Sequence, residues 1–494
     1  MSILLKKVWE TMSTRLLSSS STCYSDTDDQ RKRNLDLMYE ESDDLYNKYC
    51  CLTSTIGAFD KIPSDIFHQI LKFLGPKESA KLTLVCKSWK LLVSDNRLWV
   101  FFLQNFNTHD YSTWDSIVFA EKHLRSGYPL LPPHQSPHLS FMSIYGQRSE
   151  LTGSVIIDGG TGYCKFGWSK YASPSGRSAT FLEFGNIESP MYSRLRHFFA
   201  TIYSRMQVKP SGQPIIVSIP ISQSHGTDSG KAARRQLKET IHQVLFDMNV
   251  PAVCAINQAT LALYAARRTS GIVVNIGFNV TSVVPILRGK VMRDVGVEVV
   301  ELGASKLTGF LKEKMQQKNM RFGSLYTVRT LKENLCYVAA DYEEALSKNK
   351  QASFKVAGEG WFTLSEECFQ TGEILFQPQL GGVNTIGLHH AIALCMNRCQ
   401  AAEATVDGGW FKTVVLAGGT ACLLGLPERL DKELQSLLTS SLSEGLRVLP
   451  PAYGAESAWF GAKTISNMST FCETWCVTKK QFRRKSRRSF ISSW

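Results

Sequence analysis

From Gly153 onward, short apolar runs alternate with longer amphipathic stretches. The runs VIID, PIIVSIP, GIVVNIG and TVVLAGG are rich in β-branched residues and are closed by glycine or proline. Such runs are typical of strands that are buried on both faces. Between them lie stretches with helical periodicity, such as ARRQLKETIHQVLFDM. This alternation predicts an α/β fold built on buried sheets.

A second pattern occupies residues 62–103, where apolar side chains recur at helical spacing. Pro63 suits the first turn of a helix, and Gly75-Pro76 is a signal that ends one. One helix face is marked by Ile62, Ile66, Ile70 and Leu74, a second helix by Leu82, Val85, Trp89 and Leu92, and a third apolar group by Leu98, Trp99, Phe102 and Leu103.

About forty residues are too few to bury this much apolar surface on their own. A protein partner would cover the remainder. The alternative is an ordinary helical subdomain that packs on its own chain. The residue order favours the partner, because a proline, the motif Val-Cys-Lys-x-Trp at 85–89 and then Leu98-Trp99 follow one another as in an F-box.

Residues 58–104 therefore resemble an F-box, a region that docks its carrier onto the small Skp-type adaptor of a cullin ubiquitin ligase. Ile62 stands where that family usually has leucine. The resemblance implies that the adaptor contacts a set of largely apolar side chains, namely Ile62, Pro63, Ile70, Leu74, Val85, Trp89 and Trp99.

The remaining boundaries follow changes in composition. Residues 1–57 contain a serine run and acidic pairs, and we expect most of them to be disordered. Residues 105–150 form a linker that ends in the proline-rich stretch YPLLPPHQSPH. The α/β body spans 151–478, and a basic tail spans 479–494.

The body resembles actin, a fold of two α/β lobes with a nucleotide in the cleft between them. A glycine-rich turn follows the first predicted strand and carries Asp158, Gly160, Thr161, Gly162 and Lys165. Glycines let the backbone approach phosphates, and successive N–H groups form an anion nest. Thr161 can donate to a phosphate oxygen, Lys165 adds positive charge, and Asp158 can hold water on a magnesium ion.

Further segments match actin in the same order along the chain. Gln258 takes the place of the glutamine that positions water, and 375–378 and 387–389 match a later landmark. Alone, Lys332-Glu333 would be a solvated helix face, but the ordered series favours a nucleotide contact. The resemblance implies weak binding of ATP or ADP with Mg²⁺, and an empty cleft is the alternative. The binding residues would be those of the first turn together with Gln258, Gly277, Lys332, Glu333, Gly418, Gly419 and Thr420.

Several positions depart from the actin pattern. Asn275 and Phe278 stand where actin's second phosphate loop has carboxylates, and Ser282 replaces a histidine that helps to orient the attacking water. Cys422 and Leu423 replace the residues that usually flank the adenine. Phosphoryl transfer depends on such positioning and electrostatic groups. We therefore expect no efficient ATP hydrolysis, and no catalytic residues are assigned.

The stretch between the first predicted turn and the strand PIIVSIP is short. Only about fifty residues, Gly167 to Gln213, separate the two, and they hold no counterpart of actin's long inserted lobe and its contact loop. The resemblance then implies that longitudinal filament contacts are missing. The order of F-box, actin-like body and missing lobe resembles the plant actin-related proteins that carry an F-box.

Composition excludes several classes of protein. Of the 494 residues 43% are hydrophobic, as in globular proteins, and no apolar run reaches eighteen residues, so we expect no membrane span. The start MSILLKKVWE has no signal-peptide core. The thirteen cysteines form no C-x-x-C pair, which favours reduced thiols in the cytosol or nucleus. Burial explains Cys395/Cys399 and Cys472/Cys476 better than a metal site does.

The net charge of +13 is distributed unevenly. Seven basic residues and no acidic residue lie in KKQFRRKSRR, residues 479–488, so the body is not uniformly basic. Such a cluster is typical of nuclear import signals. The alternative is a solvated basic tail that carries no targeting signal. We expect location in the nucleus, with retention in the nucleolus and some protein in the cytoplasm, through Lys479, Lys480, Arg483, Arg484, Lys485, Arg487 and Arg488.

Two functions fit these features. The first is an adaptor of a Skp–cullin ubiquitin ligase, in which the actin-like body holds an unknown protein substrate. The second is a nuclear actin-related scaffold in chromatin-associated assemblies, in which the F-box governs turnover of the chain or is idle. An ATPase is the weakest interpretation, because residues 275, 278 and 282 have lost the groups that assist hydrolysis.

Overall fold

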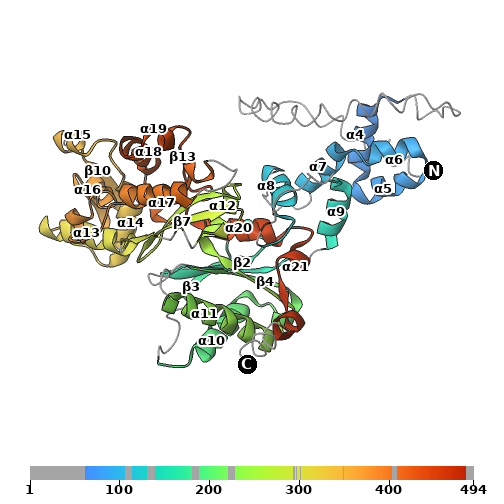
Figure 1. Cartoon of the computed structure of the whole chain (residues 1–494), viewed down its shortest axis with the longest axis horizontal. Coiled ribbons are helices and arrows are strands. Elements are labelled where there is room, and N and C mark those ends of the chain that lie inside the picture. The colour runs from blue at the N-terminus through green and yellow to red at the C-terminus, as the bar shows by residue number, and fades with distance from the viewer. Residues whose placement is uncertain are drawn as a thin grey trace. The chain divides into compact units, whose positions relative to one another are not determined.

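The computed structural model describes residues 62–105, 114–128, 130, 139–150, 152–180, 188–220, 228–292, 295, 298–300, 302–348, 350–402 and 409–484 (Figure 1). Three predicted segments lie outside the described residues. They are residues 1–57, which were expected to be disordered, nearly all of the proline-rich stretch, and the tail from Lys485. The chain divides into two compact units, the first ending at Phe106 and including residues 140–146, and the second holding the rest.

The first unit is helical. Its helices are α4 (Ser64–Leu74), α5 (Pro76–Lys81), α6 (Lys87–Val93) and α7 (Asn96–Gln104), with a 3-10 turn at Leu82–Leu84. Gly75 ends α4 with a φ of +83°, a backbone conformation that glycine adopts without strain. The expectation of a second helix through residues 82–92 is wrong, because Cys86 is extended and its sulfur accepts the N–H of Trp89 as the cap of α6.

This unit has a core of its own. The buried side chains include Phe67, Leu71, Val93, Leu98 and Trp99. The indole Nε1 of Trp99 donates to the carbonyl of Val93 at 2.6 Å, and its ring lies 5.3 Å from that of Tyr145 in α9 (Phe141–Glu150). Trp99 is only 2% exposed. It is therefore a core residue here, which corrects its assignment to the adaptor-binding surface.

The second unit begins within the predicted linker. Residues 114–124 form α8 (Trp114–Phe119) and a π-helical turn, Ala120–Leu124. The carboxylate of Glu121 is fully buried and accepts hydrogen bonds from Arg148 at 3.1 Å and from Ser469. The indole of Trp475 donates to the carbonyl of Leu124 at 3.1 Å. Residues 114–128 are thus packed on the body, so the boundary predicted at residue 151 is too late.

The first sheet has six strands. In spatial order they are β14 (Val477–Thr478), β5 (Ala252–Asn257), β4 (Ile215–Ile219), β1 (Val155–Gly159), β2 (Tyr163–Trp168) and β3 (Gly176–Ala179). Strand β1 pairs with β4 in parallel and with β2 antiparallel, and this register sets Asp158 opposite Lys165. The predicted strands at 155–158 and 214–220 are confirmed.

The second sheet repeats this path. Its order is β13 (Arg447–Leu449), β12 (Thr413–Ala417), β6 (Gly271–Ile276), β7 (Thr281–Leu287) and β8 (Lys290–Val291), with β9 (Glu298–Val300) also paired to β7. In both sheets an antiparallel hairpin is followed by two parallel strands on its other side. The turns after β1 and after β6 therefore occupy equivalent places in the two sheets.

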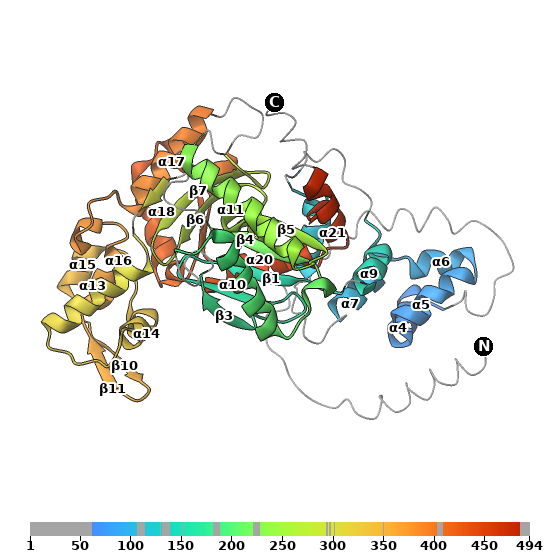
Figure 2. The same cartoon turned by 90° about the horizontal axis from the view of Figure 1, so that it is seen from below.

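Helices cover both sheets. On the first, α10 (Met191–Met206) and α11 (Asp228–Asp247) lie side by side and pack on the face that carries Val155 and Ile157 (Figure 2). Ile156 faces the opposite way, toward α12 (Gln258–Ala265) and α20 (Ser457–Ser466). These two helices touch closely, since a Cβ on Gly461 would lie 1.8 Å from the carbonyl oxygen of Leu261.

Helices α13 to α18 belong to the half of the body that holds the second sheet, and α19 and α21 follow them in the chain. Their bounds are α13 (Ala304–Gln317), α14 (Leu325–Leu335), α15 (Tyr342–Ser347), α16 (Glu367–Glu373), α17 (Leu388–Ala402), α18 (Leu426–Leu437), α19 (Ser440–Ser443) and α21 (Phe471–Thr474). A separate hairpin joins β10 (Ala352–Val356) to β11 (Gly360–Leu364). The α/β fold with two sheets, preceded by a small helical region, is the predicted fold class.

Beyond the end of β2 at Trp168, the short stretch up to Gln213 contains β3 and α10 as its only strand and α-helix within the described residues 169–180 and 188–213. Among the residues that the structure describes, no helix has the length and apolar character needed to cross a membrane.

Candidate functional site

Three turns meet between the two sheets. The first follows β1 (residues 160–162), the second follows β6 (277–280) and the third follows β12 (418–422). A Cβ on Gly277 would lie 3.5 Å from the hydroxyl of Thr161. A Cβ on Gly418, where φ is +93°, would lie 2.2 Å from the carbonyl oxygen of Ile276. We call these turns the loop cluster; glycine is needed at 418 because the backbones approach so closely.

A chain of hydrogen bonds links the two sheets beneath the loop cluster. Asn275 Nδ2 donates to Gln258 Oε1 at 3.2 Å, and Gln258 Nε2 donates to Asp158 Oδ1 at 2.7 Å. The same carboxylate oxygen accepts from Ser218 Oγ at 2.7 Å, and Ser218 Oγ accepts from the N–H of Gly159. Asp158 is 4% exposed. Protein groups thus occupy Oδ1 of the carboxylate that the sequence assigned to magnesium-bound water.

Lys165 is also bonded within the protein. It lies on β2, is 5% exposed, and its ammonium group donates to the carbonyl oxygen of Ala455. A buried ammonium group is costly unless it is hydrogen-bonded, and the bond to Ala455 meets this requirement for Lys165. Cys422 lies near this charge: burial raises the pKa of its thiol, and Lys165 acts in the opposite direction.

Phe278 fills the space between the first and second turns. A Cβ on Gly162 would lie 2.6 Å from Cγ and 2.7 Å from Cβ of Phe278. Phe278 is nevertheless 45% exposed, so its ring caps the first turn instead of entering the core. Ser282 lies on β7 opposite Asn275 in the strand register and is 3% exposed. Neither position supplies a carboxylate or an imidazole.

Helix α14 carries the other predicted nucleotide contacts. Lys332 Nζ donates to Thr308 Oγ1 at 3.0 Å and to the carbonyl of Ala304 at 3.2 Å, and burial lowers the pKa of this lysine. Glu333 is exposed and accepts from Arg329 at 2.8 Å. Lys332 therefore fastens α14 to α13, and Glu333 forms a surface ion pair.

The third turn retains unused hydrogen-bonding capacity. Thr420 is 5% exposed, and its Oγ1 has no hydrogen-bond partner among the described residues. Gly419 lies near Ala455, whose Cβ would be 3.7 Å from a Cβ on the glycine. The first and third turns thus keep groups that suit phosphate. The second turn does not, because Phe278 stands against Gly162 and Asn275 is tied to Gln258.

These contacts decide how well a nucleotide fits. Asp158, Thr161, Gly162, Gln258, Gly277 and Gly418 are brought together as the sequence predicted. As arranged here, however, Asp158 Oδ1, both amide atoms of Gln258 and the space beside Gly162 are taken by the protein itself, so the site does not fit a nucleoside triphosphate with magnesium. Ser218 and Ala455 were missed; Ser218 could have been noticed as the one polar residue inside the strand PIIVSIP.

The predicted adaptor-binding side chains lie on a separate, helical unit. Pro63 and Val85 are exposed, whereas Ile62, Ile70, Leu74 and Trp89 are half-buried. Large apolar side chains are also exposed at residues that were not assigned to the adaptor, namely Ile66 (43%), Phe73 (46%), Leu84 (88%) and Leu91 (59%). Ile66 lies on the marked helix face but was not assigned to the adaptor, whereas Phe73, Leu84 and Leu91 are apolar residues at positions that were not marked.

The basic cluster begins inside the fold. Residues 479–484 are helical, and the ring of Phe482 stacks on that of His242 in α11 at 5.5 Å. Lys479 Nζ donates to the carbonyl of Phe246 at 2.8 Å. The expectation of a tail starting at 479 is therefore corrected. Lys480, Arg483 and Arg484 are exposed, and Lys485, Arg487 and Arg488 lie outside the described residues.

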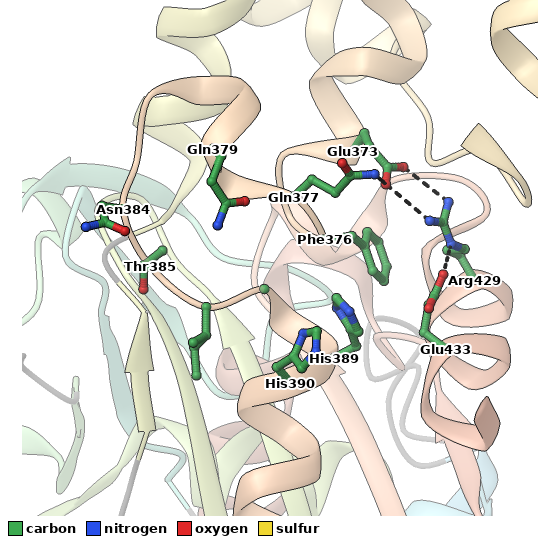
Figure 3. A pocket seen from close by; sticks show the side chains of 12 residues that line it. Glu373, Phe376, Gln377, Gln379, Asn384, Thr385, His389, His390, Arg429 and Glu433 are labelled. Atoms are coloured by element: carbon green, nitrogen blue, oxygen red, sulfur yellow. Dashed lines mark hydrogen bonds and ion pairs between the residues drawn. The ribbon is translucent and has the colours of Figure 1, made fainter. Parts of the chain in front are cut away.

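A pocket away from the loop cluster is lined by α16, the loop before α17, α17 and α18 (Figure 3). Arg429 bonds both carboxylate oxygens of Glu373 at 3.1 Å, and it also bonds Glu433 at 2.7 Å. Burial raises the pKa of Glu373, against the opposing effect of Arg429, and burial lowers the pKa of His389 to about 4. None of the residues predicted to bind nucleotide lines this pocket.

None of the cysteines in the part of the chain that the structure describes forms a disulfide. Cys395 and Cys399 are buried in α17, as expected, whereas Cys472 is exposed beside the buried Cys476. Within the same described residues no three His, Cys, Asp or Glu side chains form a group that could hold a metal ion.

Comparison with known proteins agrees with this architecture. The Actin family model matches residues 196–490, and an F-box-like model matches residues 59–105. The chain is 66% identical over 436 residues to actin-related protein 8 of Arabidopsis thaliana, covering 88% of this chain and 92% of that one. It is 61% identical over 446 residues to actin-related protein 8 of Oryza sativa subsp. indica, covering 89% and 91%. The chain therefore belongs to the actin family and, within it, to the actin-related protein 8 group.

Proposed function

We propose that this protein is a substrate receptor of a Skp–cullin ubiquitin ligase. The observation that carries the proposal is the exposed apolar surface of the helical unit, which already has its own core. Leu84 is 88% exposed and Leu91 59%, and Ile66 and Phe73 lie seven residues apart, on one face of α4. Apolar exposure on this scale is typical of a binding surface.

An adaptor would gain free energy by covering these side chains. Each Å² of apolar surface removed from water contributes about 25 cal/mol, so burying several large side chains would drive association. The half-buried Ile62, Ile70, Leu74 and Trp89 would form the floor of such a contact. Trp99 would act indirectly, because it shapes the core beneath them.

In this proposal the actin-like body serves to hold the protein substrate and performs no catalysis. Actin folds typically bind a nucleotide with magnesium, but efficient hydrolysis needs charged groups that position water and stabilise the transferred phosphoryl group. Asn275, Phe278 and Ser282 do not supply them. The lack of a long insertion between Gly167 and Gln213 further supports a body that binds other proteins without forming filaments.

We further propose that the protein acts in the nucleus, including the nucleolus. Lys480, Arg483 and Arg484 are exposed and immediately precede Lys485, Arg487 and Arg488. An import receptor or the phosphates of nucleic acid could contact such a cluster from solvent. Phosphorylation of Ser486 or Ser489 would cancel part of its charge.

The test is co-purification of the tagged full chain from plant cells. Wild type should bring down a Skp-type adaptor and a cullin. Replacing both Leu84 and Val85 with Asp should abolish this, because charges cannot enter a dry contact, yet the exposed positions leave folding intact. Leu424→Asp is the matched control, since Leu424 is 76% exposed on the actin-like body.

Retention of adaptor and cullin by the double variant would contradict the proposal. Recovery of chromatin-remodelling subunits without adaptor or cullin would instead support the nuclear scaffold. Comparing chains with and without residues 62–104 shows whether the remaining partners depend on the helical unit.

A further inference from the structure

We propose that the cleft of the actin-like body is held closed by its own side chains in place of a nucleotide. Three contacts cross between its parts: Phe278 against Gly162, the hydrogen-bonded chain Asn275–Gln258–Asp158, and the bond from Lys165 to the carbonyl of Ala455. Together they join the first sheet, the second sheet and the segment that leads into α20.

The direction of the hydrogen-bonded chain depends on the amide at 275. Asn275 donates to the oxygen of Gln258, which leaves the nitrogen of Gln258 free to donate to Asp158. An aspartate at 275 has no donor when ionised. It would place a second carboxylate beside the glutamine and break this sequence of donors. The departure from actin at 275 is thus what allows Gln258 to link the two sheets.

Phe278 joins the first and second turns, as the hydrogen-bonded chain joins the two sheets. Its side chain covers Gly162, where a Cβ would be 2.6 Å from Cγ of the ring. A phosphate group could approach the N–H groups of this turn only after the ring moved. Such movement would return apolar surface to water at a cost of about 25 cal/mol per Å². The aromatic ring therefore competes with phosphate for the same glycine.

Lys165 completes the closure. Its ammonium group is buried and bonded to Ala455, so phosphate would have to replace that bond. In a cleft that depends on nucleotide, a ligand supplies these partners and its removal loosens the two halves. Here the partners are supplied within the chain, so the arrangement of the two sheets is independent of ATP and magnesium.

The experiment uses the purified full chain and Mg-ATP. For wild type we expect no thermal shift as Mg-ATP is raised, and identical amide hydrogen exchange at residues 155–165 and 271–281 with and without it. The double variant Asn275→Asp with Phe278→Asp, which restores carboxylates, should gain a thermal shift that grows with ATP concentration. Phe278→Leu, which keeps an apolar cap, should gain none.

A concentration-dependent thermal shift in wild type, with new exchange protection in both segments, would overturn the proposal. So would a double variant that folds and exchanges like wild type yet shows no gain. The exchange measurement on wild type decides the question even if the double variant does not fold. Adaptor co-purification is a separate readout, so failure here is distinguishable from failure of the proposed function.

Discussion

Phe278 lies directly over Gly162, so that the second turn of the actin-like body covers the first. The contact is close enough that a Cβ at position 162 would be 2.6 Å from Cγ of the ring. These residues are 116 positions apart in the chain and belong to equivalent turns of two different sheets. Their contact makes the cleft a packed region of the protein.

Gly162→Ala should lower the stability of the body, because the added methyl group cannot coexist with the present position of Phe278. Overpacking of this kind costs about 1–3 kcal/mol. Phe278→Ala should relieve the clash, so the double variant should be less destabilised than the sum of the two single variants. Chemical denaturation of all four proteins measures this coupling, and strictly additive effects would show that the two residues do not touch.

Arg429→Met should be severely destabilising, because it leaves the fully buried Glu373 without its ion-pair partner. Breaking a buried pair in this way costs about 3–5 kcal/mol. Burial already raises the pKa of Glu373, so the penalty should shrink at acidic pH, where the carboxyl is protonated. Arg329→Ala is the control: it removes an exposed i,i+4 pair with Glu333 and should change stability by about 0.5 kcal/mol or less.

His389 should make stability depend on pH. Burial and, after it, the neighbouring His390 lower its pKa from 6.5 to about 4; Glu433 acts in the opposite direction and Arg429 in the same one. The unfolded chain therefore binds a proton first, and the contribution of His389 is present above pH 6.5 and lost as pH falls toward 4. Thermal unfolding between these values should be less pH-dependent in His389→Gln than in wild type. The exposed His197→Gln should behave like wild type.

The purified chain should not form actin-like filaments. The stretch 167–213 holds no long inserted lobe, so each subunit lacks the contact loop that would bind the neighbouring subunit of a filament. High-speed sedimentation with salt, magnesium and ATP should leave the protein in the supernatant, and negative-stain images should show single particles. Ordered filaments at high protein concentration would contradict this prediction.

Replacing the basic residues among 483–488 with Ala should reduce nuclear accumulation of a fluorescent fusion. Arg483 and Arg484 are exposed, so the change leaves the packing of Phe482 on α11 intact. The control removes charge elsewhere, at the exposed Lys348, Lys350 and Lys355. Exclusion of wild type from the nucleus, or equal accumulation of the variant, would show that the cluster is not an import signal.

The sequence by itself determined the local elements of this protein. The buried strands were visible as continuous apolar runs, since a strand covered on both faces has no polar side to show. The end of α4 was visible at Gly75-Pro76, because glycine readily adopts the positive φ found there and proline fixes its own φ and lacks an N–H group. The F-box-like region and the three turns of the actin-like body were likewise readable from motifs of a few residues in a fixed order.

Only the tertiary structure decided which surfaces meet. Trp99 has the same apolar character as Leu84, yet one is in a core and the other is exposed, and spacing along a helix does not reveal what packs against it. The residues that close the cleft, Asp158, Gln258 and Asn275, come from separate strands and a helix. Their contacts depend on how the two sheets are placed, because hydrogen bonding and packing act between neighbours in space, whatever their distance along the chain.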